Sequence, residues 1–319
     1  MKIVFLDAKS IGEDIDLSGY DKLGEVVKYN FTKTHEASER VKDADVVVLN
    51  KTLINEETIG SAKNLKLVCV TATGTNNLDK EYLEKRGIAW RNVADYSTNS
   101  VAQHTFALLF YLMEKMKYYD DYVKTESYVN DVMFTHFEKK FHELAGKTFG
   151  IVGLGNIGIK VADIAKAFGC KVIYYSTSGK NNKEGYKRVG FDELLEKSDI
   201  ISVHAPLDEN TKDLMDYKAF TKMKKSAIFL NLGRGPIVVE KDLARALNEG
   251  RIAAAGLDVL VEEPMSENNP LKEIKDSNRL LITPHIAWAP KEMRQLVIDR
   301  LAENLQAWLD GRMLNRVDR

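Results

Sequence analysis

Three short stretches in the last third of the chain carry side chains suited to proton transfer and anion binding. "NLGRGPIV" holds Arg234 between two glycines, "GLDVLVEEP" holds Glu263 before a proline, and "TPHIAWA" holds His285. An imidazole titrates nearest to neutral pH and can donate or accept a proton. A guanidinium can grip a carboxylate with two parallel hydrogen bonds. Each stretch alone is weak evidence, because Arg234 could hold a loop, Glu263 could face solvent and His285 could end a core strand.

An earlier stretch, "GLGNIG" at residues 153–158, has the spacing of a phosphate-binding turn. An apolar strand is predicted before it and an amphipathic helix, 156–168, after it. Gly153 would allow the tight turn, Gly155 would let the backbone approach a pyrophosphate, and Gly158 would let the helix pack on the strand. The free N–H groups of the helix would favour the phosphates. The alternative is a glycine-rich turn without a ligand, but the order strand, turn, helix favours a dinucleotide.

The residue after the next predicted strand bears on which dinucleotide binds. Dinucleotide sites usually place an acidic residue there, about 20 positions on, to bind the ribose 2′-hydroxyl. Ser176 stands at that point, and Lys180 and Lys183 follow before the first carboxylate, Glu184. A carboxylate would repel a 2′-phosphate, whereas a serine would not and can also bind an unphosphorylated ribose. Both NAD and NADP therefore stay open as cofactors.

These groups need elements that place them at one edge of a sheet. Continuous apolar runs at 2–8, 45–50 and 65–72 are typical of parallel strands covered on both faces. Further strands are predicted in a second unit, with helices at 156–168, 240–249 and 291–310 and one long helix at 98–117. The strands of that unit are expected at 148–152, 171–175, 199–204, 227–231, 253–257 and 280–283. Because ligands of open parallel sheets bind beyond the carboxyl ends of the strands, the motifs should converge there.

Composition excludes several classes of protein. The 319 residues are 44% hydrophobic and 29% charged with a formal net charge of −1, which fits a globular protein and gives no sign of a nucleic-acid or membrane surface. The absence of a CxxC pair or a His/Cys cluster makes a metal site unexpected. Cys69 and Cys170 adjoin strand-like runs and are expected to be reduced core residues of a cytoplasmic protein. The aromatic and charged segment after the long helix predicts a homodimer contact through residues 98–142, with an irregular packed connection as the alternative.

The motifs together resemble those of the D-isomer-specific 2-hydroxyacid dehydrogenases, over nearly the whole chain. The resemblance rests on "ATGTNNLD" (72–79), "SVAQHTFALL" (100–109), "ELAGKTFGIVGLGNIG" (143–158) and "HAPLDENTKDL" (204–214), besides the three stretches described first. "ATGTNN" combined with "HIAWA" is most similar to the glycerate dehydrogenase, or hydroxypyruvate reductase, branch. The resemblance implies reduction of a small 2-keto acid to the D-2-hydroxy acid with NADH or NADPH.

The resemblance also implies roles for individual residues. His285 would be the general acid, Glu263 rather than its neighbour Glu262 would orient it, and Arg234 would bind the substrate carboxylate and polarise its carbonyl. Asp258 would bind the nicotinamide carboxamide, although a turn-capping role is the alternative. The remaining candidates are Gly153, Gly155, Asn156, Ile157, Gly158, Ser176, His204, Pro206, Thr211 and Leu232 for the cofactor, and Thr73, Gly74, Thr75 and Trp288 for the substrate.

The predicted fold is α/β, with two doubly wound parallel-sheet domains, one Rossmann-like and one flavodoxin-like, and an active-site cleft between them. Residues 99–288 would form the nucleotide-binding domain, inserted into a substrate domain built from 1–98 and 289–319. Hydroxypyruvate or glyoxylate is the expected substrate. The alternatives are a broader D-2-keto acid reductase such as D-lactate dehydrogenase, and a non-enzymatic protein that senses NAD(H), because a fold alone does not fix a function.

Overall fold

The computed structural model describes residues 1–312 and 314, which divide into two compact units. The first unit joins Met1–Ser97 to the C-terminal segment that begins at Trp288, and the second unit is Thr98–Ala287. Both junctions lie one residue before the boundaries expected from the sequence. Residues 313 and 315–319, the end of the predicted segment 289–319, lie outside the described residues.

The first unit is built on a parallel sheet of order β2-β1-β3-β4-β5. The sequence predicted its three central strands but not the two at its edges. Edge strands lack the continuous apolar run of a doubly covered strand: β2, "EVVK", is exposed at both ends, and β5 is only three residues long. The bounds are β1 Lys2–Phe5, β2 Glu25–Lys28, β3 Val46–Leu49, β4 Leu67–Val70 and β5 Ala89–Arg91.

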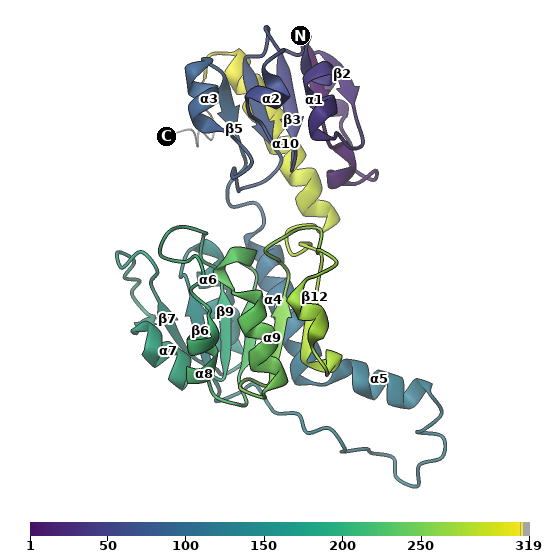
Figure 1. Ribbon diagram of the computed structural model, residues 1–319, viewed down its shortest axis with the longest axis vertical. Coiled ribbons are helices and arrows are strands. Elements are labelled where there is room, and N and C mark those ends of the chain that lie inside the picture. Colours follow the sequence, from purple (N-terminus) through teal and green to yellow (C-terminus); the bar gives the residue numbers. More distant parts are fainter. Residues whose placement is uncertain (313, 315–319) are drawn as a thin grey trace. The chain divides into compact units, whose positions relative to one another are not determined.

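Both faces of this sheet are buried, because alternate residues of each strand enter different cores. Ile3 and Phe5 pack with Val297 and Leu301 of the C-terminal helix α10, whereas Val4 joins the core on the opposite face. That opposite core is closed by α1 Thr34–Val41, α2 Glu56–Ile59 and α3 Lys80–Lys85, and α10 spans Lys291–Leu309 (Figure 1). The first unit is therefore doubly wound.

The second unit holds a longer parallel sheet of order β12-β11-β10-β9-β6-β7-β8. The chain runs from β6 outward to β7 and β8, then returns to β9 on the other side of β6. Ligands of such sheets bind where the direction reverses, beyond the carboxyl ends of the strands. The bounds are β6 Thr148–Val152, β7 Lys171–Tyr175, β8 Lys187–Arg188, β9 Ile200–Val203, β10 Ile228–Asn231, β11 Ala254–Leu257 and β12 Leu280–Ile282.

Helices cover this sheet on both sides as well (Figure 1). One core contains Phe149 and Ile151 of β6 with residues of α4 and α6, and the other contains Val152 with residues of α7, α8 and α9. The two units thus confirm the prediction of two doubly wound α/β domains. The bounds are α4 Thr98–Met113, α5 Met116–Lys124, α6 Asn156–Ala167, α7 Phe191–Lys197, α8 Tyr217–Lys222 and α9 Glu240–Asn248.

The prediction of a single long helix at 98–117 is wrong in one respect. The chain forms two helices there, because Lys115 adopts a left-handed backbone with φ of +56° that no α-helix continues through. None of the nine residues of α5 is buried, so the new direction carries α5 and the following loop away from the sheet (Figure 1). Among the described helices, none combines the length and the apolar composition that crossing a bilayer requires.

Candidate active site

The three side chains singled out first follow three neighbouring strands. Arg234 comes after β10, Glu263 after β11 and His285 after β12, and these strands lie side by side and parallel in the order β12-β11-β10. Since parallel strands end at the same edge of a sheet, the three loops share that edge. The sheet topology therefore gathers residues that are up to 51 positions apart in the sequence.

The structure pairs His285 with Glu263. Nδ1 of His285 lies 2.7 Å from Oε2 of Glu263, and both side chains keep part of their surface exposed. The other carboxylate oxygen, Oε1, accepts the backbone N–H of Leu260 at 3.1 Å, which fixes the carboxylate. Glu262, the rival carboxylate, is exposed and takes no part in this pair. With Nδ1 engaged, Nε2 of His285 is the ring nitrogen left to meet a ligand.

The backbone around His285 is held by the carboxylate of Asp258, which is 2% exposed. Its Oδ1 accepts the N–H of Ile286 at 2.9 Å and the hydroxyl of Thr283 at 2.6 Å, and Oδ2 accepts the N–H of Ala287 at 2.9 Å. These contacts hold His285 in a left-handed conformation with φ of +55°, which costs a residue with a side chain roughly 1–2 kcal/mol. Asp258 thus caps the turn, as the alternative from the sequence proposed, and its contact with a nicotinamide stays a prediction.

The loop that bears Arg234 packs directly against the loop that bears Glu263. A Cβ on Gly235 would lie 1.9 Å from the backbone oxygen of Leu260, so only glycine allows the two backbones to approach this closely. The buried Asn231 shapes the same turn, because its side chain accepts the N–H of Gly233 and donates to the carbonyl of Arg234. The second glycine of "GRG" is therefore explained by the packing of this loop.

Three residues that position the site were not singled out from the sequence. Glu240, at the start of α9, is nearly buried and accepts the N–H of Val261 and the side-chain amide of Asn269, so it holds the loop before and after Glu263. Asn231 shapes the Arg234 turn, and His104 of α4 places Nε2 2.9 Å from Oγ1 of Thr283. For Glu240 and Asn231, a polar residue directly at a helix start or a strand end was the only signal in the sequence, and His104, within α4, gave no such signal.

In the glycine turn after β6, the packing of the chain requires two of the three glycines but not the third. A Cβ on Gly153, whose φ is +90°, would lie 2.8 Å from the backbone of Ala205, and one on Gly158 would lie 2.3 Å from the carbonyl of Gly153. Gly155 has an ordinary extended backbone, and a Cβ there would meet no atom within 4 Å. Close approach of a phosphate explains that glycine, whereas the packing of the chain itself does not.

The first turn of α6 supplies the donors for such a phosphate. Gly155 is the N-cap of this 12-residue helix and gives it no side-chain cap. The amides of Asn156, Ile157 and Gly158 have no carbonyl four residues earlier within the helix, and they carry its positive dipole end. The residues present therefore fit a dinucleotide pyrophosphate.

The other predicted cofactor residues follow β7, β9 and β10. Ser176 and Leu232 are largely buried, Pro206 is exposed, and Thr211 is fully buried, where its hydroxyl donates to the carbonyl of Pro206 at 2.7 Å. His204 places Nε2 2.8 Å from Ser202 Oγ, and burial lowers the pKa of His204 to about 3, so its ring is neutral. Their contacts with a cofactor stay predictions.

The predicted substrate residues Thr73, Gly74, Thr75 and Trp288 belong to the first unit. Thr73 donates its hydroxyl to the carbonyl of Val93, which fixes the loop after β4. Trp288 is half-buried and meets the ring of Tyr96 edge-on, with 6.3 Å between centroids, so it packs on the core of that unit. The part of these residues in a site with Arg234 stays a prediction.

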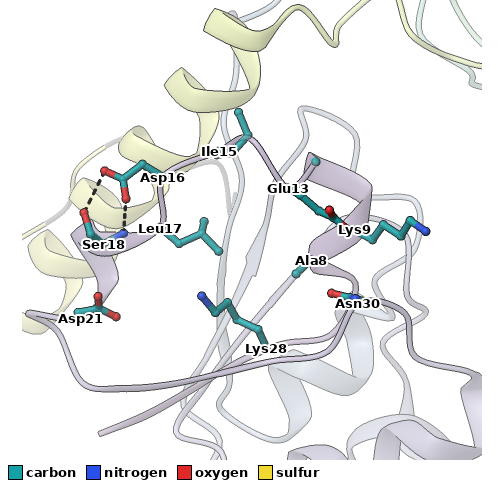
Figure 2. A pocket seen from close by; sticks show the side chains of 11 residues that line it. Ala8, Lys9, Glu13, Ile15, Asp16, Leu17, Ser18, Asp21, Lys28 and Asn30 are labelled. Carbon is teal, nitrogen blue, oxygen red and sulfur yellow. Dashed lines mark hydrogen bonds between the residues drawn. The ribbon is translucent and has the colours of Figure 1, made fainter.

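A hollow of about 480 Å³ also opens in the first unit, between the segment after β1 and the end of β2 (Figure 2). Its charged lining is mixed, with Lys9 and Lys28 beside Glu13, Asp16 and Asp21. Asp16 is already engaged by the hydroxyl and the N–H of Ser18, which lower the pKa of its carboxyl. None of the predicted site residues lines this hollow. The described residues also include no group of three or more histidine, cysteine and acidic side chains arranged to hold a metal ion.

Comparison with known proteins finds a matching family model, similar sequences and a similar solved structure. Residues 106–287 match a family model described as the NAD-binding domain of D-isomer-specific 2-hydroxyacid dehydrogenases. The chain is 38% identical to a hydroxypyruvate reductase of Blautia hydrogenotrophica over the full length of both, and 34% identical to a glycerate dehydrogenase of Methylorubrum extorquens over 99% of each. A crystal structure of D-lactate dehydrogenase from Aquifex aeolicus, complexed with NAD and lactic acid, matches with a TM-score of 0.84 at 27% identity, over 97% of this chain and 96% of that one.

The two uncrowded N-cap glycines make a matched test of the phosphate site. Gly155→Ala should weaken binding of NADH and NADPH by about tenfold or more, because the new methyl occupies the space of the pyrophosphate. Its thermal midpoint without cofactor should match that of the unchanged protein. Gly190, the N-cap of α7, also has nothing within 4 Å of a Cβ, so Gly190→Ala should leave both properties unchanged. Fluorescence titration and thermal unfolding measure these effects; unaltered binding in Gly155→Ala contradicts the assignment.

Proposed function

Because the chain belongs to the D-isomer-specific 2-hydroxyacid dehydrogenases, we propose that it reduces hydroxypyruvate and glyoxylate, giving D-glycerate from the former, with NADH or NADPH. The observation that carries this proposal is the 2.7 Å contact between His285 and Glu263 at the ends of neighbouring strands. Names of the relatives place the chain in the glycerate dehydrogenase and hydroxypyruvate reductase branch. A broader reductase of 2-keto acids, of the D-lactate dehydrogenase type, is the second candidate, favoured by the structural likeness to such an enzyme.

Reduction of a 2-keto acid needs a hydride at the carbonyl carbon and a proton at its oxygen. A bound nicotinamide supplies the hydride. His285 donates the proton through Nε2, because Nδ1 is engaged by Glu263. Glu263 acts through His285 as a positioning residue, and its own orientation comes from the N–H of Leu260. In the opposite direction His285 removes the hydroxyl proton.

The substrate carboxylate requires a cationic partner and further donors. We assign Arg234 to this carboxylate and to polarisation of the neighbouring carbonyl, because a planar guanidinium can serve both oxygens. The loop of Thr73, Gly74 and Thr75 would add backbone donors from the first unit, and Trp288 would line the apolar side. Enclosure of the bound substrate would exclude water from the reacting atoms.

Residues at the remaining strand ends are assigned to the cofactor. The amides of Asn156 and Ile157 would bind the pyrophosphate, and Asp258 the nicotinamide carboxamide, while it also caps the His285 turn. The loop of His204, Pro206 and Thr211 would flank the adenosine. Ser176 and Leu232, which follow β7 and β10, would lie at the same edge of the sheet. The neutral ring of His204 suits an uncharged neighbour such as a sugar or a base.

We also propose a homodimer formed through α5 and the loop that follows it. Val129, Val132, Phe134 and Phe137 expose 75–94% of their surface in the single chain. The loop nevertheless has a defined course, because the ring of His136 stacks on Tyr122 with 3.8 Å between centroids and its Nε2 lies 2.7 Å from Tyr118 Oη. An ordered apolar surface of this kind suits burial against a second copy, since two-fold pairing is the commonest closed assembly.

The cytosol is the compartment proposed for this protein. Cys69 and Cys170 are both free thiols, and burial raises their pKa values, to about 12 and about 11. Uncharged buried thiols of this kind fit a reducing compartment, where they act as small apolar core residues.

Turnover of a keto-acid panel tests the substrate assignment. The decrease of absorbance at 340 nm with NADH and with NADPH should be fastest with hydroxypyruvate and glyoxylate, and slower with pyruvate and branched 2-keto acids. Faster turnover of pyruvate or of the branched acids would support the broader reductase instead. Absence of turnover with every acid would contradict the proposed reaction.

Replacement of the proton donor tests the mechanism. His285→Ala should lower kcat by roughly 10²–10⁴-fold, because the carbonyl oxygen loses its positioned acid, while NADH binding persists. Glu263→Gln should lower kcat by about tenfold or more with the KM for the cofactor unchanged, since the ring of His285 loses its charged partner while the amide oxygen can still accept the N–H of Leu260. His35→Ala, at an exposed position on α1, serves as the control with unchanged kinetics. Wild-type kcat in His285→Ala would remove it as the acid.

The dimer surface is testable by charge insertion. Val132→Asp combined with Phe134→Asp should halve the molar mass in solution, because two carboxylates cannot be buried against a second copy without partners. Phe31→Asp adds a carboxylate at another exposed apolar residue, in the first unit, and should leave the mass unchanged. Light scattering coupled to size-exclusion chromatography gives the mass. A monomeric unchanged protein, or a dimer that survives both substitutions, argues against this interface.

A further inference from the structure

The turn that follows β7 adjoins the glycine turn that follows β6. The N–H of Gly153 donates to the carbonyl of Tyr175 at 3.0 Å, where β7 ends. Further along, the side-chain amide of Asn181 donates to the carbonyl of Leu154 at 2.8 Å. Residues 176–181, named here the β7 turn, are therefore tied at both ends to the loop proposed to bind the pyrophosphate. A dinucleotide seated on that loop would place its adenosine ribose near the β7 turn.

The hydroxyl of Ser176 is used to close the β7 turn. Ser176 is 4% exposed, and its Oγ accepts the N–H of Asn181 at 3.2 Å, while its carbonyl accepts the N–H of Gly179 at 3.1 Å. An acidic side chain at this point would accept hydrogen bonds from a ribose 2′-hydroxyl. No residue from 176 to 181 is acidic. The turn thus lacks the acceptor that selects an unphosphorylated ribose.

Positive charge gathers around the same turn. Arg188 of β8 brings Nη2 to 4.0 Å from the place where a Cβ of Gly179 would lie, so its guanidinium lies over the turn. Lys180 belongs to the turn itself, and Lys183 follows it. Within the described part of the chain, these three cations form no ion pair, whereas the neighbouring Lys187 lies 3.8 Å from the carboxylate of Glu193. The charge beside the turn is therefore not engaged in an ion pair with a carboxylate of the described residues.

We propose that Arg188, with the β7 turn, binds the 2′-phosphate of NADP(H) and makes the cofactor site select it over NAD(H); this specificity rests on the proposed function of the same site. A guanidinium matches a phosphate with two parallel charge-assisted hydrogen bonds, and no carboxylate of the β7 turn opposes the phosphate. Gly179 leaves the space over the turn free of a side chain, and Lys180 adds a second cation. Arg188 is thus a specificity-determining residue outside the glycine motif. It lies on β8, the second strand after that motif.

Binding of two adenosine fragments to the full chain tests the proposal without the redox reaction. Adenosine 2′,5′-bisphosphate carries the 2′-phosphate, and 5′-AMP lacks it. By calorimetry at fixed ionic strength, the unchanged protein should bind the bisphosphate about tenfold or more tightly than 5′-AMP. Arg188→Ala should reduce this ratio by about tenfold without weakening 5′-AMP. Lys187→Ala, the adjacent basic residue on the same strand, should retain the ratio.

A second variant and the alternative outcomes complete the test. Ser176→Asp introduces the missing carboxylate and should reverse the preference, in the fragments and in titrations with NADPH and NADH. Equal binding of the two fragments by the unchanged protein, or binding of neither, overturns the proposal. An unaltered ratio in Arg188→Ala, or an equal loss in Lys187→Ala, overturns the role of Arg188. Fragment binding needs no keto acid. This measurement therefore distinguishes failure of the proposed cofactor specificity from failure of the proposed reaction.

Discussion

The carboxylate of Asp258 is the contact on which the candidate active site depends. It accepts the N–H groups of Ile286 and Ala287 and the hydroxyl of Thr283, and so ties the loop after β12 to the end of β11. Hydrogen bonds to a charged acceptor contribute about 1.5–3 kcal/mol each, which exceeds the roughly 1–2 kcal/mol cost of the left-handed backbone at His285. The imidazole can therefore be held toward Glu263 in a conformation that the local sequence would not choose.

The loops at this edge are matched to one another through backbone contacts as much as through side chains. Gly235 brings the Arg234 loop against the backbone of Leu260, and Glu240, at the start of α9, fixes the loop that bears Leu260 and Glu263. Leu260 in turn donates its N–H to Glu263. The position of the Glu263 carboxylate beside His285 thus depends on residues that touch no proposed ligand. A general acid needs this kind of support, because small displacements of the reacting groups reduce the rate strongly.

The sequence was informative where a residue type has few structural uses. Runs such as "VVVL" and "LVCV" predicted central strands, since short strands buried on both faces read as continuously apolar. It failed at β2, β5 and β8, whose edge positions leave them short or polar, and at Lys115, whose left-handed backbone splits the expected helix. Asp258 shows a third case, because the sequence left two roles open and the structure supplies the turn-capping contacts of one.

The sequence by itself determined the family and the two α/β units, and it singled out His285, Glu263 and Arg234 as the candidate acid, carboxylate and guanidinium, because those residue types recur in motifs whose chemistry admits few substitutes. Only the tertiary structure decided that Glu263, which the resemblance favoured over Glu262, lies within hydrogen-bond distance of His285, that Gly155 is the glycine without a packing role, and that Arg188 lies over the β7 turn. These facts depend on which loops the parallel strands bring together across the sheet, and separation along the chain carries no information about that proximity.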